Sequence, residues 1–330
     1  MLRYLARRTI AAIVLVAVVS SAALLLTRLA PGDFASDLFG TGASAETIAK
    51  ERARYGLDRP VAVQYLDWLA RAARLDFGTS LVYRRPVSEL VGQRAANTAL
   101  LAVTALLLAT IVGLPAGIVS GSRRHGAVAS AIRGTSIVLL SLPTLVTSLV
   151  FVLVAARTGW LPTGGMESAG AWEGGLLAGL ADVAWHLPLP ALAIALPLAA
   201  MIERVQAQSM GEVMRMPYAL AALARGVPRG RLVWRDWWRP SIGPVAALYG
   251  FIVGSLLGGS FVVEVVTSWP GLGRLMYDAL RARDLFLVAG CAAAGSVFLA
   301  VGSLLADLVQ AWADPRVGPR GDGNGAGAAA

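Results

Sequence analysis

The sequence contains a single lysine, Lys50, among 29 basic side chains, and this scarcity excludes one large class of ATP chemistry. A phosphate-binding loop places lysine after glycine and before serine or threonine, because its ammonium must reach the β and γ phosphates. Lys50 instead lies between Ala49 and Glu51. No nucleophile, histidine and acid follow one another in an order typical of a hydrolase either. We therefore expect a protein that is not an enzyme and does not itself hydrolyse ATP.

Cysteine and histidine are almost as rare as lysine. Cys291 is the one cysteine, which excludes an internal disulfide, and its place in an apolar run favours a small core residue. The two histidines, His125 and His186, are well separated and do not build a Cys/His metal site. We therefore expect no metal and no other cofactor in this chain.

Charged side chains make up only 15% of the sequence, against 56% apolar residues and a mean hydropathy of +0.65. Since soluble domains carry about 25% charged residues, the composition indicates an integral membrane protein. About 20 apolar residues in a helix cross the roughly 30 Å hydrocarbon core. Runs of that length without Asp, Glu, Lys or Arg occupy residues 9–27, 95–122, 134–156, 183–202, 240–263 and 285–306.

These runs predict an all-α integral membrane protein with six transmembrane helices. Their lack of charge has a physical cause, because an ionised side chain at the centre of a span costs about 2.5–3.5 kcal/mol on insertion scales. The fourth run is expected to be kinked, since Pro188, Pro190 and Pro197 interrupt it and His186 lies near its start.

The charges between the runs predict the orientation of the chain. Residues 1–8, 123–133, 203–239 and 307–330 carry +3, +3, +4 and −1, a total of +9. Residues 28–94, 157–182 and 264–284 carry +2, −2 and 0, a total of zero. Because basic residues favour the cytoplasm, both termini and the 203–239 connection are predicted to be cytoplasmic. The basic excess thus reflects topology, and no nucleic-acid partner is expected.

The predicted organisation has five parts. Residues 1–8 form a cytoplasmic N-terminus, 9–27 the first span, and 28–94 a sizeable extracytoplasmic segment with helices of its own. Residues 95–317 form a core with five spans, and 318–330 are a small-residue tail that we expect to be disordered.

Two features predict helices within the extracytoplasmic segment. Ser44, Ala45 and Glu46 are typical of a helix start, and residues 61–75 alternate apolar and charged faces with helical periodicity. The second helix either lies on the membrane surface or contacts an outside partner. Its expected apolar side consists of Tyr65, Leu66, Trp68, Leu69, Ala72 and Ala73.

Glycines four residues apart indicate close helix packing, because small residues let two backbones approach. The partner of each row is either another span of this chain or a second membrane subunit, and the sequence leaves both open. The rows are Gly113, Gly117 and Gly121 on the second span, and Gly250, Gly254 and Gly258 on the fifth.

A series of short motifs resembles the permease subunits of bacterial dipeptide, oligopeptide and nickel ABC importers, over residues 1–317. The motifs lie at residues 28–33 (Arg-Leu-Ala-Pro-Gly-Asp), 55–60 (Tyr-Gly-Leu-Asp-Arg-Pro), 76–80 (Asp-Phe-Gly-Thr-Ser), 141–143 (Ser-Leu-Pro), 159–162 (Gly-Trp-Leu-Pro), 268–274 (Ser-Trp-Pro-Gly-Leu-Gly-Arg) and 314–316 (Asp-Pro-Arg).

The resemblance implies that the 203–239 connection holds a helix that docks on an ATPase. Importer permeases carry a Glu-Ala-Ala signature there, followed by glycine; this chain lacks the glutamate, as is common in the subfamily. Tyr218 supplies a rigid anchor, alanines supply a low-relief face, and Gly226 ends the helix through a left-handed backbone or close approach. The expected coupling residues are Tyr218, Ala221, Ala222, Ala224, Arg225, Gly226 and Arg235.

A rival interpretation of the same connection is an interfacial helix held on anionic lipid by Arg229, Arg231 and Arg235. His186 also has two interpretations, a proton-relay residue or a satisfied histidine at a span end, and we favour the second.

The function implied is that of a permease subunit with the type I importer permease fold, in the bacterial inner membrane. Its expected partners are a second homologous permease, ABC ATPase subunits, an extracytoplasmic binding protein and membrane lipid. Solutes of such importers include peptides, nickel chelates and glutathione. The binding protein is expected to approach residues 31–94, 157–182 and the 269–273 turn. Alternatives are an ion-coupled secondary transporter, disfavoured because the six runs lack Asp, Glu, Lys and Arg, and a non-transporting membrane scaffold.

Overall fold

The computed structural model describes residues 2–29, 45–54, 58–123 and 126–313. Over these residues the protein is helical, with one isolated β-bridge between Thr79 and Pro86 and no β-strand. The all-α prediction is confirmed. The predicted 318–330 tail, the Ser44 cap and the 314–316 motif lie outside the described residues.

Helices long and apolar enough to cross a membrane confirm the expectation of a multi-span protein. Four meet the criterion by themselves: α1 (Leu2–Leu29), α5 (Val87–Ser122), α9 (Pro188–Val213) and α15 (Leu285–Ala313). Two bent helix pairs bring the number of spans among the described residues to six when each pair is counted once.

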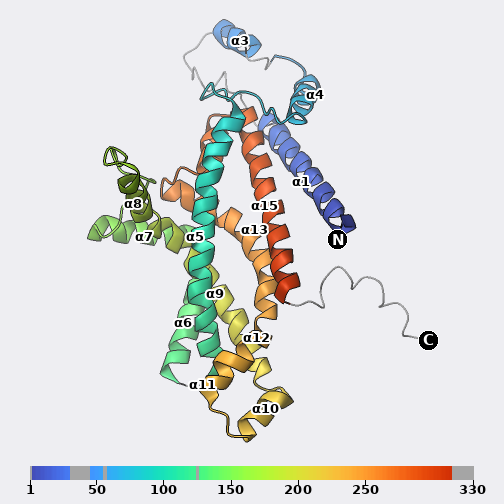
Figure 1. Ribbon diagram of the computed structural model, residues 1–330. Helices are drawn as coiled ribbons and strands as arrows, with labels where there is room; N and C mark the ends of the chain where they lie inside the picture. Colours follow the sequence, from blue (N-terminus) through green and yellow to red (C-terminus); the bar gives the residue numbers. More distant parts are fainter. Residues whose placement is uncertain (1, 30–44, 55–57, 124–125, 314–330) are drawn as a thin grey trace, which may run out of the picture. The chain divides into compact units, whose positions relative to one another are not determined.

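The third predicted run, 134–156, is not one continuous helix, and that part of the expectation is wrong. It is divided into α6 (Ala127–Ser141) and α7 (Thr144–Thr158), which meet at 105°. The cause is Pro143, which lacks an N–H and disfavours helical backbone in the residue before it. Leu142 accordingly adopts the extended conformation, with φ −90° and ψ 121°. In Figure 1, α7 lies crosswise to α6.

The kink expected in the fourth run lies at only one of its three prolines. α8 (Leu176–His186) ends before Leu187, and α9 begins at Pro188, where a missing N–H costs nothing. Pro197 remains inside α9. The fifth run consists of α12 (Trp238–Ser241) and α13 (Gly243–Val266), and α13 bends by 51° between Gly254 and Gly258.

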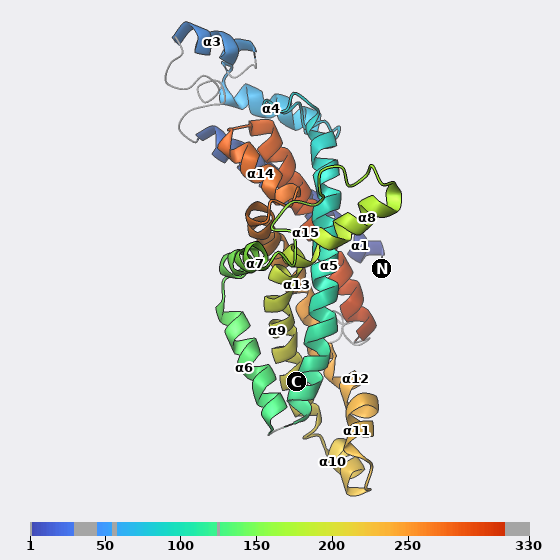
Figure 2. The same cartoon turned by 90° about the vertical axis from the view of Figure 1, so that its left-hand side faces the viewer.

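The chain forms two compact units, described separately below. Unit 1 comprises Leu100–Trp269 and the described residues from Val301 onward; unit 2 comprises the described residues of Leu2–Ala99 and Pro270–Ala300. In unit 1, α9 is the central helix and contacts α6, α7 and α13. Figures 1 and 2 show α6 and α9 side by side. The core of unit 1 includes the buried residues Leu101, Ala105, Ala195, Ile202, Ile252 and Trp269.

The glycine row on α5 packs against α9 of the same chain. A Cβ on Gly113 would lie 2.5 Å from the Ala199 oxygen, and a Cβ on Gly121 would lie 2.5 Å from the Ala207 oxygen. A Cβ on Gly117 would lie 2.6 Å from the Gln206 Cβ. Such distances leave no room for a side chain, so the two backbones are in direct contact. A Cβ on Gly258 of α13, in contrast, meets no atom within 4 Å.

Unit 2 contains α1, α3 (Ala45–Arg54), α4 (Val61–Ala72), α14 (Leu272–Arg281) and the first part of α15. The two helices expected after the first span are therefore present. α4 packs on α1, where Trp68 is buried beside Leu24 and the Tyr65 hydroxyl donates to Ser21 Oγ at 3.0 Å. Leu66 is 61% exposed, so the predicted apolar side of this helix is only partly covered.

A buried carboxylate organises another part of unit 2. Asp284 precedes α15, and its Oδ1 accepts the Leu287 N–H at 3.1 Å, which is the geometry of a helix N-cap. Its Oδ2 accepts the Ser80 hydroxyl at 2.6 Å and the backbone N–H groups of Leu81 and Val82 at 2.7 and 3.1 Å. One side chain thus caps a helix and fixes the segment before α5.

Replacing a glycine in the α5 row should destabilise unit 1. Gly117→Val inserts a branched side chain into the backbone contact with α9, and overpacking of this kind costs about 1–3 kcal/mol. Thermal unfolding of the purified protein in detergent measures the effect. Gly134→Val on α6 is the control, because a Cβ there meets nothing within 4 Å. Equal unfolding temperatures for the two variants would contradict the packing.

Removing the Asp284 carboxylate should loosen the segment that it holds. In Asp284→Ala the α15 cap is lost, which costs about 0.5–2 kcal/mol, and two N–H groups lose their acceptor. Hydrogen exchange at residues 80–86 should accelerate relative to that in Asp67→Ala. Asp67 is a suitable control since its ion pair with Arg59 is solvent-exposed. Unchanged protection in Asp284→Ala would exclude this role.

Candidate functional site

The connection after α9 is built from short helices that lie at the C-terminal ends of α5 and α9 (Figures 1 and 2). They are α10 (Pro217–Ala224), α11 (Arg229–Arg231), the π-helix η2 (Leu232–Trp237) and α12. Pro217 is the first residue of α10, a position where its fixed φ favours the helix and its missing N–H is not needed. The helix expected in this connection is present.

Gly226 ends α10 in a Schellman motif. Its N–H donates to the Leu223 oxygen at 2.9 Å, and the Val227 N–H donates to the Ala222 oxygen at 3.4 Å. Gly226 has φ +77°, and a Cβ there meets nothing within 4 Å. Of the two reasons that the sequence offers for glycine, the left-handed backbone therefore applies, and no described residue of this chain approaches Gly226 closely.

The alanines of α10 point to two different sides. Ala219 is fully buried and Ala222 packs beside it, both against residues of this chain. Ala221 and Ala224 are exposed, as are Tyr218 (50%) and Leu220 (53%). The alanines of α10 therefore do not form one face that a partner could contact. The surface open to a partner consists of Tyr218, Leu220, Ala221, Ala224 and Arg225.

The inner side of α10 belongs to a hydrophobic cluster that we call the loop core. The loop core joins α10 and η2 to the ends of two long helices, because Ala219, Leu232 and Trp237 pack there with residues of α5 and α9. A rigid, close-packed cluster transmits displacement. Its buried members are Ile118, Met210, Val213, Ala219, Leu232 and Trp237.

Hydrogen bonds add a second link between this connection and α9. Gln206 Nε2 donates to Ser241 Oγ at 2.6 Å, and the Ser241 hydroxyl donates to the Trp238 oxygen at 2.8 Å. Gln206 and Ser241 are both fully buried. α12 is therefore fastened to α9 in the interior of unit 1.

The π-helix is a feature that sequence analysis missed. It buries Leu232 and Trp237 while leaving Trp234, Arg235 and Asp236 exposed. A groove of about 740 Å³ separates η2 and α10 from the end of α5. Arg229, Arg231 and Arg235 are all exposed, and the expected coupling residue Arg235 belongs to η2 rather than to α10.

Sequence analysis also missed a buried acid in α9. The helix continues past the apolar run that ends at Ile202, and Glu203 in this extension is only 3% exposed. Its Oε1 accepts a hydrogen bond from Ser120 Oγ of α5. Glu264, near the end of α13, is fully buried as well. The statement that no span carries an acid therefore holds for the apolar runs but not for the helices that contain them.

Polar contacts order part of the 157–182 segment, one of those expected to meet a binding protein. Asp182 accepts the backbone N–H of Ser168 at 2.6 Å and its hydroxyl at 2.9 Å. The Ser168 N–H lowers the pKa of the Asp182 carboxyl. His186 is 6% exposed, and its Nδ1 lies 2.8 Å from the Asp182 backbone oxygen, consistent with a satisfied histidine.

The 269–273 turn does not fit the surface expected there. Trp269 is fully buried in the core of unit 1, and Leu272 is 6% exposed. In unit 2, Asn97 Nδ2 donates to the Pro270 oxygen at 2.8 Å, and the Leu272 N–H donates to Thr98 Oγ1 at 2.8 Å. The turn thus serves mainly to hold α14 against α5, which corrects the expectation that it faces a partner.

Apolar helices of spanning length define the class of multi-span membrane proteins, and comparison with known proteins identifies the family. Residues 113–319 match "Binding-protein-dependent transport system inner membrane component", and residues 1–102 match "Binding-prot-dependent transport system membrane comp, N-term". The chain belongs to this family and is a multi-pass protein of the inner membrane. The resemblance noted in the motifs is confirmed.

Relatives match over nearly their whole length. The oligopeptide transport system permease protein AppB of Bacillus subtilis (strain 168) is 32% identical over 319 residues, which cover 96% of this chain and 99% of the relative. The glutathione transport system permease protein GsiC of Salmonella typhimurium is 32% identical over 322 residues, with the same coverage. The probable peptide ABC transporter permease protein y4tP of Sinorhizobium fredii is 31% identical, covering 95% and 98%.

Proposed function

We propose that this chain is the permease subunit of an ATP-driven importer for peptides or related small solutes. With a second, homologous permease it forms the path across the membrane, and an extracytoplasmic binding protein delivers the solute. The family match over most of the chain carries the proposal. The peptide class is supported by the names of relatives for oligopeptides, glutathione and peptides.

ATP hydrolysis is assigned to separate ATPase subunits, and the chain needs no cofactor of its own. The outer side of α10 is proposed to sit in a cleft of the ATPase, with Tyr218 as its anchor. Because the inner side packs in the loop core, a displacement of α10 reaches α5 and α9 through Ile118 and Met210. The coupling residues Tyr218, Ala221, Ala224, Arg225 and Gly226 then act on the path without contacting the solute.

The surfaces that we assign to the second permease and the binding protein are ones that this chain does not itself cover. The α5 glycine row is occupied by α9, so it is not offered to a second subunit. We assign that role to the Gly250, Gly254 and Gly258 row of α13, where a Cβ on Gly258 meets nothing. Residues 31–94 and 157–182 are proposed to face the binding protein, and both termini are proposed to be cytoplasmic.

Gly226→Val should uncouple the transporter. A branched residue at φ +77° costs roughly 1–2 kcal/mol and reorients the end of α10. Because the substitution lies outside the spans, the chain should still insert, but copurification of the ATPase or ATP-driven uptake should fall. Gly230→Val is the matched control, since Gly230 is exposed and has no positive φ. Ala221→Trp should act like Gly226→Val by lifting α10 off its partner.

The competing lipid-anchor interpretation makes the opposite expectation. Under that interpretation, uptake is normal in Gly226→Val and Ala221→Trp. It falls instead when Arg229, Arg231 and Arg235 are removed. Normal uptake and full ATPase retention in both substituted proteins would show that α10 is not the coupling element. Ala222→Trp is unsuitable for this test, because Ala222 packs in the loop core and the larger side chain would disturb the chain itself.

Single cysteines should report the orientation. In a Cys291→Ser background, Lys50→Cys should react with an impermeant thiol reagent on intact cells and Gly230→Cys should not. Lys50 and Gly230 are both exposed, so accessibility depends on the side of the membrane. Permeabilised cells that lack the ATPase subunits provide the control, in which both positions should react. Labelling of position 230 but not of position 50 on intact cells would invert the orientation.

A further inference from the structure

A groove at the ends of α5, α6 and α9 collects arginines from three different segments of unit 1. Its volume is about 610 Å³. Arg123 follows α5, Arg133 belongs to α6, and Arg215 follows α9. Among the described residues that line the groove, the one acid is Glu212, which accepts a hydrogen bond from Gln208 Nε2 at 3.3 Å. Three arginines and one glutamate give these lining residues a net charge of +2.

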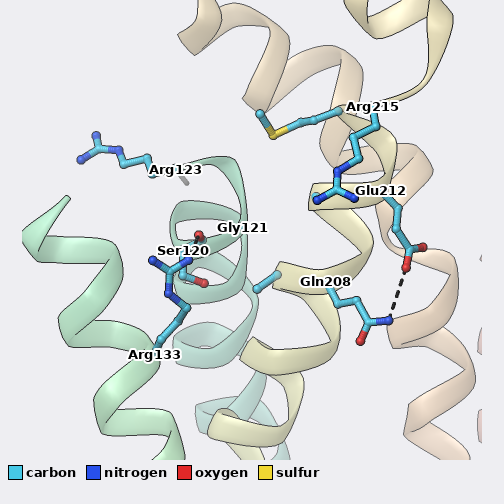
Figure 3. A pocket seen from close by; sticks show the side chains of 10 residues that line it. Ser120, Gly121, Arg123, Arg133, Gln208, Glu212 and Arg215 are labelled. Atoms are coloured by element: carbon cyan, nitrogen blue, oxygen red, sulfur yellow. Dashed lines mark hydrogen bonds between the residues drawn. The ribbon is translucent and has the colours of Figure 1, made fainter. Parts of the chain in front are cut away.

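Two of the guanidinium groups approach the groove from opposite sides (Figure 3). Arg133 reaches across from α6, and its Nη1 donates to the Ser120 backbone oxygen at 3.4 Å. Arg215 points into the groove from the other side, while Arg123 lies at the rim with its guanidinium turned outward. Guanidinium groups bind phosphate through paired N–H donors. The site therefore suits a phosphate-bearing ligand.

An apolar hollow continues from the groove along α6. The two share Arg133 and Ala207 in their linings, and the second has a volume of about 400 Å³. Ile137 and Leu140 follow Arg133 by four and seven residues, so the three side chains lie on one face of the helix. Leu140 lies about 10 Å from Arg133 along the axis. The hollow also contains the oppositely charged pair Glu203 and Arg204.

We propose that this groove binds an anionic phospholipid of the cytoplasmic leaflet. Its phosphate lies between Arg133 and Arg215, and one acyl chain follows Ile137 and Leu140 of α6. A basic site that adjoins an apolar surface matches a charged headgroup attached to a hydrocarbon chain, and basic pockets between spans recognise such headgroups. A soluble phosphate fills only the first hollow. An acidic protein segment satisfies the arginines but leaves the apolar hollow uncovered.

The bound lipid has a structural consequence, because the groove is formed by the same helices that carry the coupling connection. A headgroup held by Arg133 and Arg215 links α6 to the end of α9, next to the glycine contact of α5 with α9. The inference rests on the proposed function only through its orientation, since it requires these helix ends to face the cytoplasm. The cysteine labelling above tests that orientation separately.

Lipid retention by the complete transporter tests the proposal. The purified complex in detergent is titrated with phosphatidylglycerol or with phosphatidylcholine of the same acyl chains, and bound lipid is counted by native mass spectrometry. The wild type should retain phosphatidylglycerol preferentially. Arg133→Gln and Arg215→Gln should each weaken retention about fivefold, and the double variant about 25-fold. Arg239→Gln is the control, because Arg239 is exposed and does not line the groove.

Further variants separate the lipid from other occupants. Arg133→Lys keeps the charge and should retain most of the binding, which distinguishes a lost ligand from a misfolded site. Unchanged phosphatidylglycerol retention in the double variant overturns the proposal. Displacement of the lipid by millimolar inorganic phosphate shows a soluble-anion site and overturns it too. Loss of ATPase subunits from the double variant with lipid retention intact identifies a protein-docking surface instead, which also overturns it.

Discussion

The direct backbone contact between α5 and α9 is the constraint on which unit 1 depends. Lipid tails are as apolar as the helices, so association within a membrane relies on close packing rather than on burial from water. Gly113, Gly117 and Gly121 provide that packing because none of them places a side chain in the contact. Because the register is fixed over about two turns, Ser120 meets Glu203. The ends of both helices are thereby set side by side.

The connection after α9, which we propose couples the permease to an ATPase, is attached to this fixed pair of helices. Ile118 of α5 and Met210 of α9 both contribute to the loop core, and Gln206 holds α12 through Ser241. The inner side of α10 is thus part of the permease, while its outer side is free for a partner. In the function proposed above, this division transmits a push on the outer side of α10 to α5 and α9.

Sequence alone predicted the apolar runs, the all-α class and the helix before Gly226, because hydropathy, proline and glycine act locally. It did not predict which alanines of α10 face inward, since Ala219 and Ala221 differ only in their tertiary neighbours. The burial of the acids in the helices was not predicted for the same reason. Glu203 extends a span beyond its apolar run because Ser120, 83 residues away, satisfies its carboxylate.

Two further predictions from the sequence differ from the structure. Pro143 divides one apolar run into α6 and α7, although the run is uncharged throughout and long enough to span. Trp269, expected at a surface near a partner, is buried because it packs in the core of unit 1. Because Glu203 and Glu264 are buried, an absence of buried acids is no argument against an ion-coupled mechanism. The argument against it is the family to which the chain belongs.

Reconstitution therefore tests the central claim most directly. Proteoliposomes that contain this chain, the second permease and the ATPase subunits are supplied with the binding protein and a labelled peptide, and uptake is measured. Our account predicts accumulation that requires ATP, the binding protein and this chain together. Uptake driven by an imposed ion gradient without the ATPase subunits would contradict it, as would ATP-dependent uptake that continues when this chain is omitted.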